Sequence, residues 1–147
     1  AFKVSCVWCF QKLARKIGDK KYLEHLTKIK YGNMKTGKNL SNFWLSGDLR
    51  ISALQQIDIL KQIYLNNLPY TNKHFSMLKD IMIVEQTPDY ILRAKSGWTM
   101  NIGWYVGYLQ KEENVWFFAL NMDIRNPSDL KYRKSIVMDA LKKKILL

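Results

Sequence analysis

The residues of this chain that could do chemistry gather at the end of one expected strand. Residues 90–98 are rich in branched and aromatic side chains, which is typical of a strand, and the run closes with Lys95, Ser96 and Gly97. A lysine and a hydroxyl at a strand end supply a fixed positive charge and a hydrogen-bond donor. The glycine lets a substrate lie along the strand without meeting a side chain. The pattern therefore predicts a substrate site along one edge of a sheet.

This arrangement is also the layout of the K-[ST]-G motif in serine enzymes that bind β-lactams. The motif alone is a weak signal, because three common residues recur by chance. A second match, Lys35-Thr36-Gly37, lies in a polar loop between Asn33 and Asn39 with no strand before it. We expect this second match to be a turn.

The elements that must position the site follow from hydrophobic spacing. Residues 103–109 and 115–122, separated by polar residues 111–114, predict two further strands of an antiparallel sheet. Apolar residues at helical spacing predict five helices. They cover residues 2–17, residues 21–29, the segment from Ser52 to before Pro69, residues 72–84, and a segment that follows Asn126-Pro127. The last helix is expected to pack on the sheet through Leu130, Ile136, Val137, Ala140 and Leu141. Gly18 is the expected stop of the first helix, and Ser52 is an expected N-cap.

These elements predict an α/β fold of the α+β type, with helices packed on an antiparallel sheet. At 147 residues the chain is long enough for one domain and too short for two, so we expect a single domain over residues 1–147. The chain opens at Ala1 without a methionine, and we expect it to be an incomplete piece of a longer precursor. The long irregular stretch from Tyr31 to Arg50 is expected to line a site.

Charge, cysteines and histidines favour no other kind of site. The net charge of +12 is spread over many lysines without stacking aromatic residues, which favours a solvated surface over a nucleic-acid module, whose binding would weaken steeply with salt. Cys6 and Cys9 form a C-x-x-C without a second pair for zinc, and we expect two small buried thiols on a helix. His25 and His74 stand alone, so no metal site is predicted. No apolar run approaches the length of a membrane span.

Seven motifs, in order along nearly the whole chain, resemble the class D (oxacillinase-type) serine β-lactamases. They are Ser5-Cys6-Val7, Tyr31-Gly32-Asn33, Phe43-Trp44-Leu45-Ser46-Gly47-Asp48-Leu49-Arg50-Ile51-Ser52, Lys95-Ser96-Gly97-Trp98, Gly103-Trp104-Tyr105-Val106-Gly107-Tyr108, Phe117-Phe118-Ala119-Leu120-Asn121-Met122-Asp123 and Arg133-Lys134-Ser135-Ile136. The resemblance implies the serine β-lactamase and penicillin-binding fold. It also implies hydrolysis of penicillin- and oxacillin-type β-lactams through a serine acyl-enzyme, and a periplasmic or secreted location.

The resemblance assigns roles to residues at the expected strand end. Lys95 would keep the site positive and help to hold the substrate carboxylate, to which Ser96, beside Gly97, would donate. Arg133 would complete this anion site as a fork-shaped partner. Trp98 would contribute its backbone N–H to the oxyanion hole. Serine replaces the commoner threonine at position 96, which keeps the hydroxyl.

Four residues earlier in the chain would serve the proton transfers. Ser5 would pass a proton toward the lactam nitrogen. Val7, Trp44 and Leu45 would form the wall around a catalytic lysine that takes up carbon dioxide as a carbamate, which requires a neutral lysine in a dry pocket. Without the resemblance, an N-cap serine and a core tryptophan would explain Ser5 and Trp44.

The S-x-x-K segment that carries the family's nucleophile and carbamate-forming lysine lies upstream of the S-x-V motif, outside this chain. The matches Ser76–Lys79 and Ser128–Lys131 fall after that motif, and we do not expect either to be the nucleophile. We therefore expect no turnover by the chain alone, no cofactor within it, and a need for the missing segment to fold fully. The alternative function is the sensor domain of a β-lactam receptor, which resembles this family and is acylated.

Overall fold

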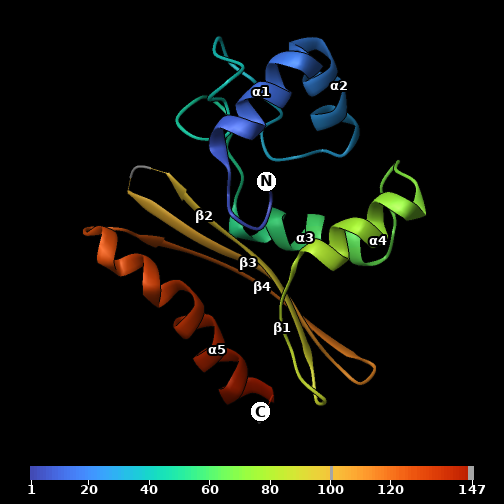
Figure 1. The fold of residues 1–147 in the computed structure, drawn as a ribbon, viewed down its shortest axis with the longest axis vertical. Coiled ribbons are helices and arrows are strands. Elements are labelled where there is room, and N and C mark those ends of the chain that lie inside the picture. The colour runs from blue at the N-terminus through green and yellow to red at the C-terminus, as the bar shows by residue number, and fades with distance from the viewer. Residues whose placement is uncertain (100, 146–147) are drawn as a thin grey trace. The chain divides into compact units, whose positions relative to one another are not determined.

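The computed structural model describes residues 1–99 and 101–145, arranged as two compact units, Ala1–Met82 and Ile83–Leu147. The first unit contains helices α1 to α4, and the second contains a four-stranded sheet and helix α5 (Figure 1). The single domain over residues 1–147 stays a prediction. The mixture of helices and an antiparallel sheet agrees with the expected fold class.

The helices of the first unit follow the hydrophobic pattern, with shifted ends. They are α1 (Val7–Ile17), α2 (Asp19–Lys28), α3 (Ala53–Tyr64) and α4 (Asn72–Ile81). Gly18 ends α1 as expected, with φ 83° and its N–H donating to the Ala14 carbonyl at 2.9 Å. The expected start at residue 2 is wrong, because residues 2–5 form a turn in which Ser5 has a left-handed φ of 49°.

Helix α3 shows why its start could be predicted. The Ser52 hydroxyl accepts from the Gln55 N–H at 3.2 Å, and the Gln55 side chain accepts from the Ser52 N–H at 3.0 Å. This capping box satisfies two N–H groups at the helix start, and it confirms the Ser52 N-cap. The helix ends at Tyr64, sooner than expected, and buries Leu60.

The second unit is built on an antiparallel sheet with the order β1-β2-β3-β4. Its strands are β1 (Ile83–Gln86), β2 (Ile91–Thr99), β3 (Ile102–Lys111) and β4 (Asn114–Asp123). The three expected strands are confirmed, and β1 was missed. The helix expected over residues 72–84 ends at Ile81, and residues 83 and 84 belong to β1, because a four-residue strand is too short to show a clear alternation.

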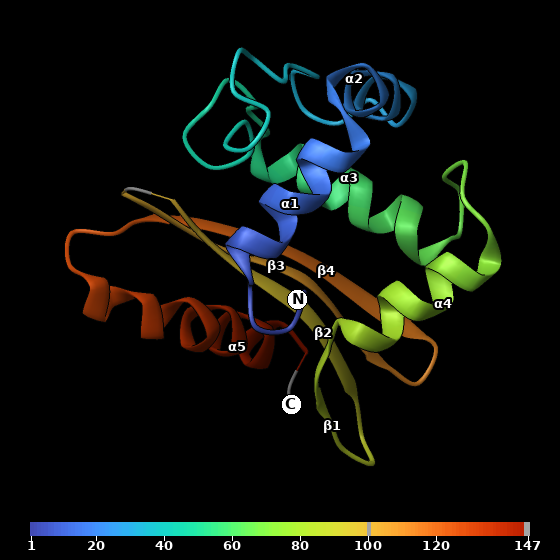
Figure 2. The same cartoon turned by 45° about the horizontal axis from the view of Figure 1, so that its top comes forward.

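Helix α5 (Tyr132–Ile145) runs along one face of this sheet (Figure 2). Asn126 caps the short 3-10 helix η1 (Pro127–Lys131) that precedes it, whereas a cap on the long helix was expected. Val137 and Leu141 are buried against the sheet as predicted, but Ile136 and Ala140 are exposed. Val137 and Leu141 share a helix face because they are four residues apart, and Ile136 and Ala140 lie one position round from that face.

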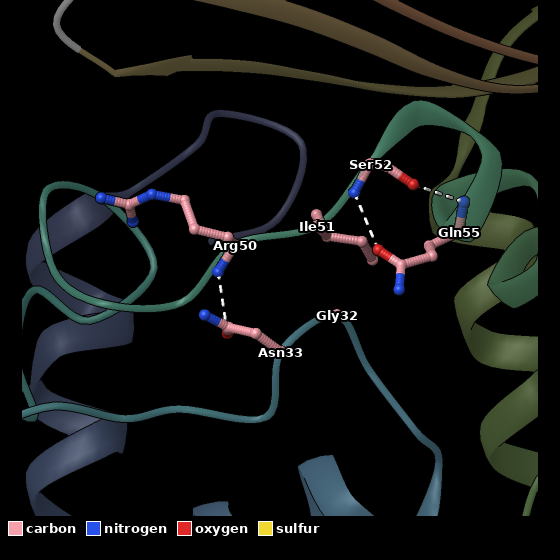
Figure 3. A pocket seen from close by; sticks show the side chains of 6 residues that line it. All are labelled: Gly32, Asn33, Arg50, Ile51, Ser52 and Gln55. Carbon is pink, nitrogen blue, oxygen red and sulfur yellow. Dashed lines mark hydrogen bonds between the residues drawn. The ribbon is translucent and has the colours of Figure 1, made fainter.

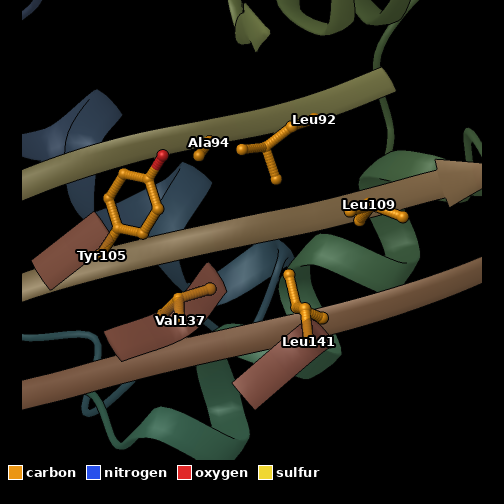
Figure 4. Close-up of a cluster of buried hydrophobic side chains, with 6 residues drawn as sticks. All are labelled: Leu92, Ala94, Tyr105, Leu109, Val137 and Leu141. Carbon is orange, nitrogen blue, oxygen red and sulfur yellow. The ribbon is translucent and has the colours of Figure 1, made fainter. Parts of the chain in front are cut away.

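The core of the second unit joins β2, β3 and α5 (Figure 4). Its buried side chains point toward one another, and they are Leu92, Ala94, Tyr105, Leu109, Val137 and Leu141. An exposed ion pair between Lys134 of α5 and Glu85 of β1, 2.7 Å long, adds little energy but ties the helix to the sheet edge. The ion pair lies beside the start of β2, where Glu85 is opposite Leu92.

The expectation of two buried thiols is wrong. Cys6 and Cys9 form a disulfide, and both residues are half-buried. Cys6 is the N-cap of α1 and Cys9 lies in its first turn, so the side chains are three residues apart and meet on the same face. Among residues 1–99 and 101–145, no helix combines the length and apolar character that crossing a bilayer requires.

Candidate functional site

An arginine from α5 reaches the strand end that carries the Lys95-Ser96-Gly97 motif. The Arg133 Nε donates to the Leu130 carbonyl at 2.9 Å, and its Nη1 donates to the Gly97 carbonyl at 2.6 Å. The two contacts fix the plane of the guanidinium beside the end of β2. Arg133 and Gly97, 36 residues apart in the sequence, are therefore neighbours.

Gly103 provides the space for this arginine, and sequence reasoning did not give it that role. It lies on β3 opposite Trp98. A Cβ added at Gly103 would come within 2.7 Å of the Ile124 Cδ1 and 3.1 Å of the Arg133 Cδ. A glycine inside a strand signals such a close approach, but only the structure identifies Arg133 as the neighbour.

Lys95 makes the same strand end more positive. Its Nζ donates to the Ser96 carbonyl at 2.6 Å, and its side chain is half-buried. Burial lowers the pKa of Lys95, and the nearby positive charge of Arg133 lowers it further. Burial likewise lowers the pKa of Arg133. An anion bound beside the two groups would relieve both penalties.

The remaining residues of the motif lie around this pair of cations. Ser96 is half-buried and lies opposite Tyr105 on β3. Trp98 is 49% exposed and lies opposite Gly103 on β3. The structure thus brings Lys95, Gly97 and Arg133 together, with Ser96 and Trp98 on the same strand.

The pKa of the Tyr105 hydroxyl depends on its burial in this part of the sheet. Burial raises its pKa to about 12, helped by the negative charge of Glu85 and opposed by the positive charge of Arg133. Because the folded pKa lies above the ordinary value of about 10, the contribution of Tyr105 to stability is present below pH 10 and is lost as the pH rises toward 12. We expect the difference in phenolate absorbance between the parent chain and Tyr105→Phe to titrate near pH 12. A midpoint near pH 10 would contradict the burial of this hydroxyl.

Ser5 and Val7 lie at the start of α1, in the first unit. Two side-chain hydrogen bonds tie α1 to the loop that carries Trp44 and Leu45, namely Gln11 to Asn42 and Arg15 to Ser41, each 3.0 Å long. Val7 and Gln11 are four residues apart and share a helix face. Val7 therefore lies on the side of α1 that is tied to this loop.

The loop itself is packed through aromatic rings. The ring of Trp44 meets that of Phe43 edge-on with centroids 4.9 Å apart, and Phe43 in turn meets Tyr22 at 5.0 Å. Phe43 is buried, while Trp44 and Leu45 are half-buried. Trp44 thus retains accessible apolar surface at the end of a fixed cluster. The Gln11–Asn42 hydrogen bond, which the sequence alone did not single out, links α1 to this loop.

The Tyr31-Gly32-Asn33 motif is structural, as expected. The Asn33 side chain donates to the Asp48 carbonyl at 2.8 Å and accepts from the Arg50 N–H at 3.0 Å. A Cβ at Gly32 would lie 2.0 Å from the Arg50 carbonyl oxygen, so only glycine fits. The hollow here, about 360 Å³, lies next to the α3 capping box (Figure 3). The guanidinium of Arg50 donates to the Gly47 and Leu49 carbonyls, and it stabilises the loop.

The site residues therefore fall into two groups, one in each unit. Ser5, Val7, Trp44 and Leu45 belong to the first, and the residues around Lys95 and Arg133 belong to the second. Whether the two groups face one cleft stays a prediction. Within the described part of the chain, histidine, cysteine and carboxylate side chains form no group of three or more that could hold a metal ion.

Comparison with known proteins decides the family. Residues 1–142 match the model of the penicillin binding protein transpeptidase domain. The chain belongs to this family. Within it, the chain is 40% identical over 141 residues to β-lactamase OXA-20 of Pseudomonas aeruginosa, covering 96% of the chain and 53% of that relative. It is 38% identical over 151 residues to β-lactamase OXA-48 of Klebsiella pneumoniae, covering 100% and 57%.

Solved structures agree. The class D β-lactamase YbXI from Nostoc superimposes with a TM-score of 0.93 at 42% identity, covering 97% of this chain and 62% of that one. The class D β-lactamase FUS-1 (OXA-85) from Fusobacterium nucleatum subsp. polymorphum superimposes with a TM-score of 0.96 at 37% identity, covering 100% and 63%. These findings confirm the class D resemblance and the fold. The chain spans about half the length of the curated relatives that it matches.

Proposed function

We propose that this transpeptidase-family chain supplies the carboxylate site and part of the proton-transfer machinery of a class D serine β-lactamase. The observation that carries the proposal is the hydrogen bond from Arg133 to the Gly97 carbonyl, which holds a guanidinium beside the Lys95-Ser96-Gly97 strand end. The similarity of the chain to enzymes named β-lactamases supports β-lactam hydrolysis as the reaction. The substrates would be penicillin- and oxacillin-type β-lactams.

Each group at the strand end has a defined task in this proposal. Lys95 and Arg133 attract the substrate carboxylate. A bound anion offsets the cost of keeping two partly buried positive charges close together. The Ser96 hydroxyl donates to the same carboxylate. The lactam carbonyl oxygen takes a hydrogen bond from the Trp98 N–H, which becomes stronger as negative charge develops on that oxygen.

Residues of the first unit would take part in proton transfer. The Ser5 hydroxyl accepts a proton and donates another to the lactam nitrogen as the ring opens. Val7, Trp44 and Leu45 offer apolar surface against which a lysine from outside this chain would lose hydration, so its pKa would fall and it could take up carbon dioxide. The indole N–H of Trp44 is suited to hold the resulting carbamate. The serine nucleophile would likewise come from outside these residues.

An exchange of segments tests the proposal. Residues 1–142 would replace the matching segment of the FUS-1 β-lactamase, and the hybrid would be assayed with a chromogenic cephalosporin and a fluorescent penicillin. We expect the hybrid to be acylated and to turn over, and the 147-residue chain alone to do neither, because it lacks the proposed nucleophile.

The controls separate the outcomes. Unaltered FUS-1 sets the reference rate, and circular dichroism shows whether the hybrid is folded. A folded hybrid that the penicillin does not label would refute the proposal. A folded hybrid that is labelled without turnover would support the β-lactam sensor instead. Turnover by the chain alone would show that the proposed division of catalytic residues is wrong.

A further inference from the structure

The disulfide at the start of α1 has no part in the proposed function. It closes a ring of four residues, Cys6 to Cys9, that encloses Val7 and Trp8. Both cysteines are half-buried, so neither lies fully inside the core. Trp8 is 69% exposed, and Val7 is 42% exposed. The disulfide therefore lies in an open surface turn.

Cys6 occupies a position that favours a thiolate. It is the N-cap of an eleven-residue helix, its side chain makes no capping hydrogen bond, and no acidic residue lies in the first turn. The N–H groups at a helix start lack partners within the helix and carry partial positive charge. Thiols placed there have a lowered pKa and exchange readily with disulfides.

Cys9 is placed differently. It lies inside the first turn, and the backbone N–H of Phe10 next to it donates to the Cys6 carbonyl at 3.3 Å. Its sulfur is held near Cys6 by the helix, since residues three apart share a face. After reduction the two sulfurs would remain neighbours, so the bond could form again without refolding of the chain.

We propose that Cys6 and Cys9 form a thiol–disulfide exchange site, whose substrates are low-molecular-weight thiols or the reduced dithiols of other proteins. A substrate thiolate attacks one sulfur of the pair, the bond between Cys6 and Cys9 breaks, and a mixed disulfide forms as the other sulfur leaves as a thiolate. A second substrate thiolate then attacks the mixed disulfide. The products are the oxidised substrate disulfide and two cysteine thiols in the protein, after each sulfur has taken up a proton.

The exchange has a local structural consequence. The disulfide ties the residue after Ser5 to the first turn of α1, and Ser5 itself has a left-handed φ of 49°. Reduction removes this link and leaves the first turn without a side-chain cap. The oxidised form therefore holds the Ser5-Cys6-Val7 motif more firmly than the reduced form, whatever reaction that motif serves.

Alkylation rates test the chemistry on the 147-residue chain once circular dichroism shows that its helices are formed. Cys9→Ser leaves Cys6 at the N-cap, and Cys6→Ser leaves Cys9 inside the helix. We expect iodoacetamide at pH 7 to modify Cys6 several-fold faster than Cys9, because the partial positive charge at a helix start favours the thiolate. In urea the two rates should become equal. Equal rates in the folded chains would overturn the role assigned to Cys6.

Redox titration and hydrogen exchange test the switch itself. In glutathione buffers of increasing reduced fraction, both thiols should appear together and reversibly, as counted by mass-tagged maleimide. Exchange of the amides of residues 10–13, of which Phe10 is the first to donate within the helix, should then accelerate, while that of α3 stays unchanged. The Cys6→Ala, Cys9→Ala double variant, which adds no side-chain cap, should exchange at the reduced rate in every buffer. A disulfide that resists glutathione in the folded chain, or amides of residues 10–13 that exchange equally in both states, would overturn the proposal, and neither result depends on β-lactam binding.

Discussion

Replacing Arg133 by alanine in the FUS-1 hybrid is expected to lower kcat/KM for penicillins by roughly 10- to 150-fold. This range corresponds to the loss of hydrogen bonds to a charged group, about 1.5–3 kcal/mol. The loss should appear mainly as a higher KM, because a carboxylate bound equally in the ground state and the transition state contributes uniform binding. Steady-state kinetics with a penicillin series would measure it.

Two matched variants make this result specific. Lys134→Ala removes a neighbouring positive charge that pairs with Glu85 on the surface, and it should change kcat/KM less than about threefold. Arg133→Lys keeps the charge but loses the fork that contacts both Leu130 and Gly97, so its KM should lie between those of the parent and the alanine variant. An unchanged KM in Arg133→Ala would remove Arg133 from the carboxylate site.

Only part of the site around Arg133 could be predicted from local sequence patterns. Lys95, Ser96 and Gly97 could be placed because a strand rich in branched residues ends at a glycine, which is a local signal. Arg133 was assigned only through resemblance, since an exposed arginine on a helix carries no local signal of its partner. The space at Gly103 beside Arg133 depends on how β3 packs against Ile124 and α5, and hydrophobic periodicity does not predict that packing.

The same distinction explains the errors in the fold. Long periodic segments such as α3, β3 and β4 were recovered with small shifts at their ends, because many residues support one pattern. Strand β1 has only four residues and pairs with β2 across a register shift, so its identity comes from its partner. The disulfide was missed because a three-residue spacing on a helix fits two separate thiols as well as a bonded pair.

Leu92→Ala is expected to destabilise the second unit by about 3–5 kcal/mol, the cost of a cavity in a packed core. Leu92 is fully buried between β3 and α5, where it lies opposite Leu109 and near Leu141. A small domain has only about 5–15 kcal/mol of stability in total, so this change would leave the sheet close to unfolding. Because α5 packs on the same cluster, the loss should also release Arg133 from Gly97.

Urea unfolding followed by far-UV circular dichroism would measure the effect, with Ile136→Ala as the matched control. Ile136 lies on the same helix as Leu141 but is 43% exposed, so its truncation should cost less than about 1 kcal/mol. Two transitions are expected if the two units unfold separately, and only one of them should shift in Leu92→Ala. A Leu92→Ala chain as stable as the Ile136→Ala control would show that this cluster does not hold the sheet and α5 together, and the Arg133 site would then lose its structural basis.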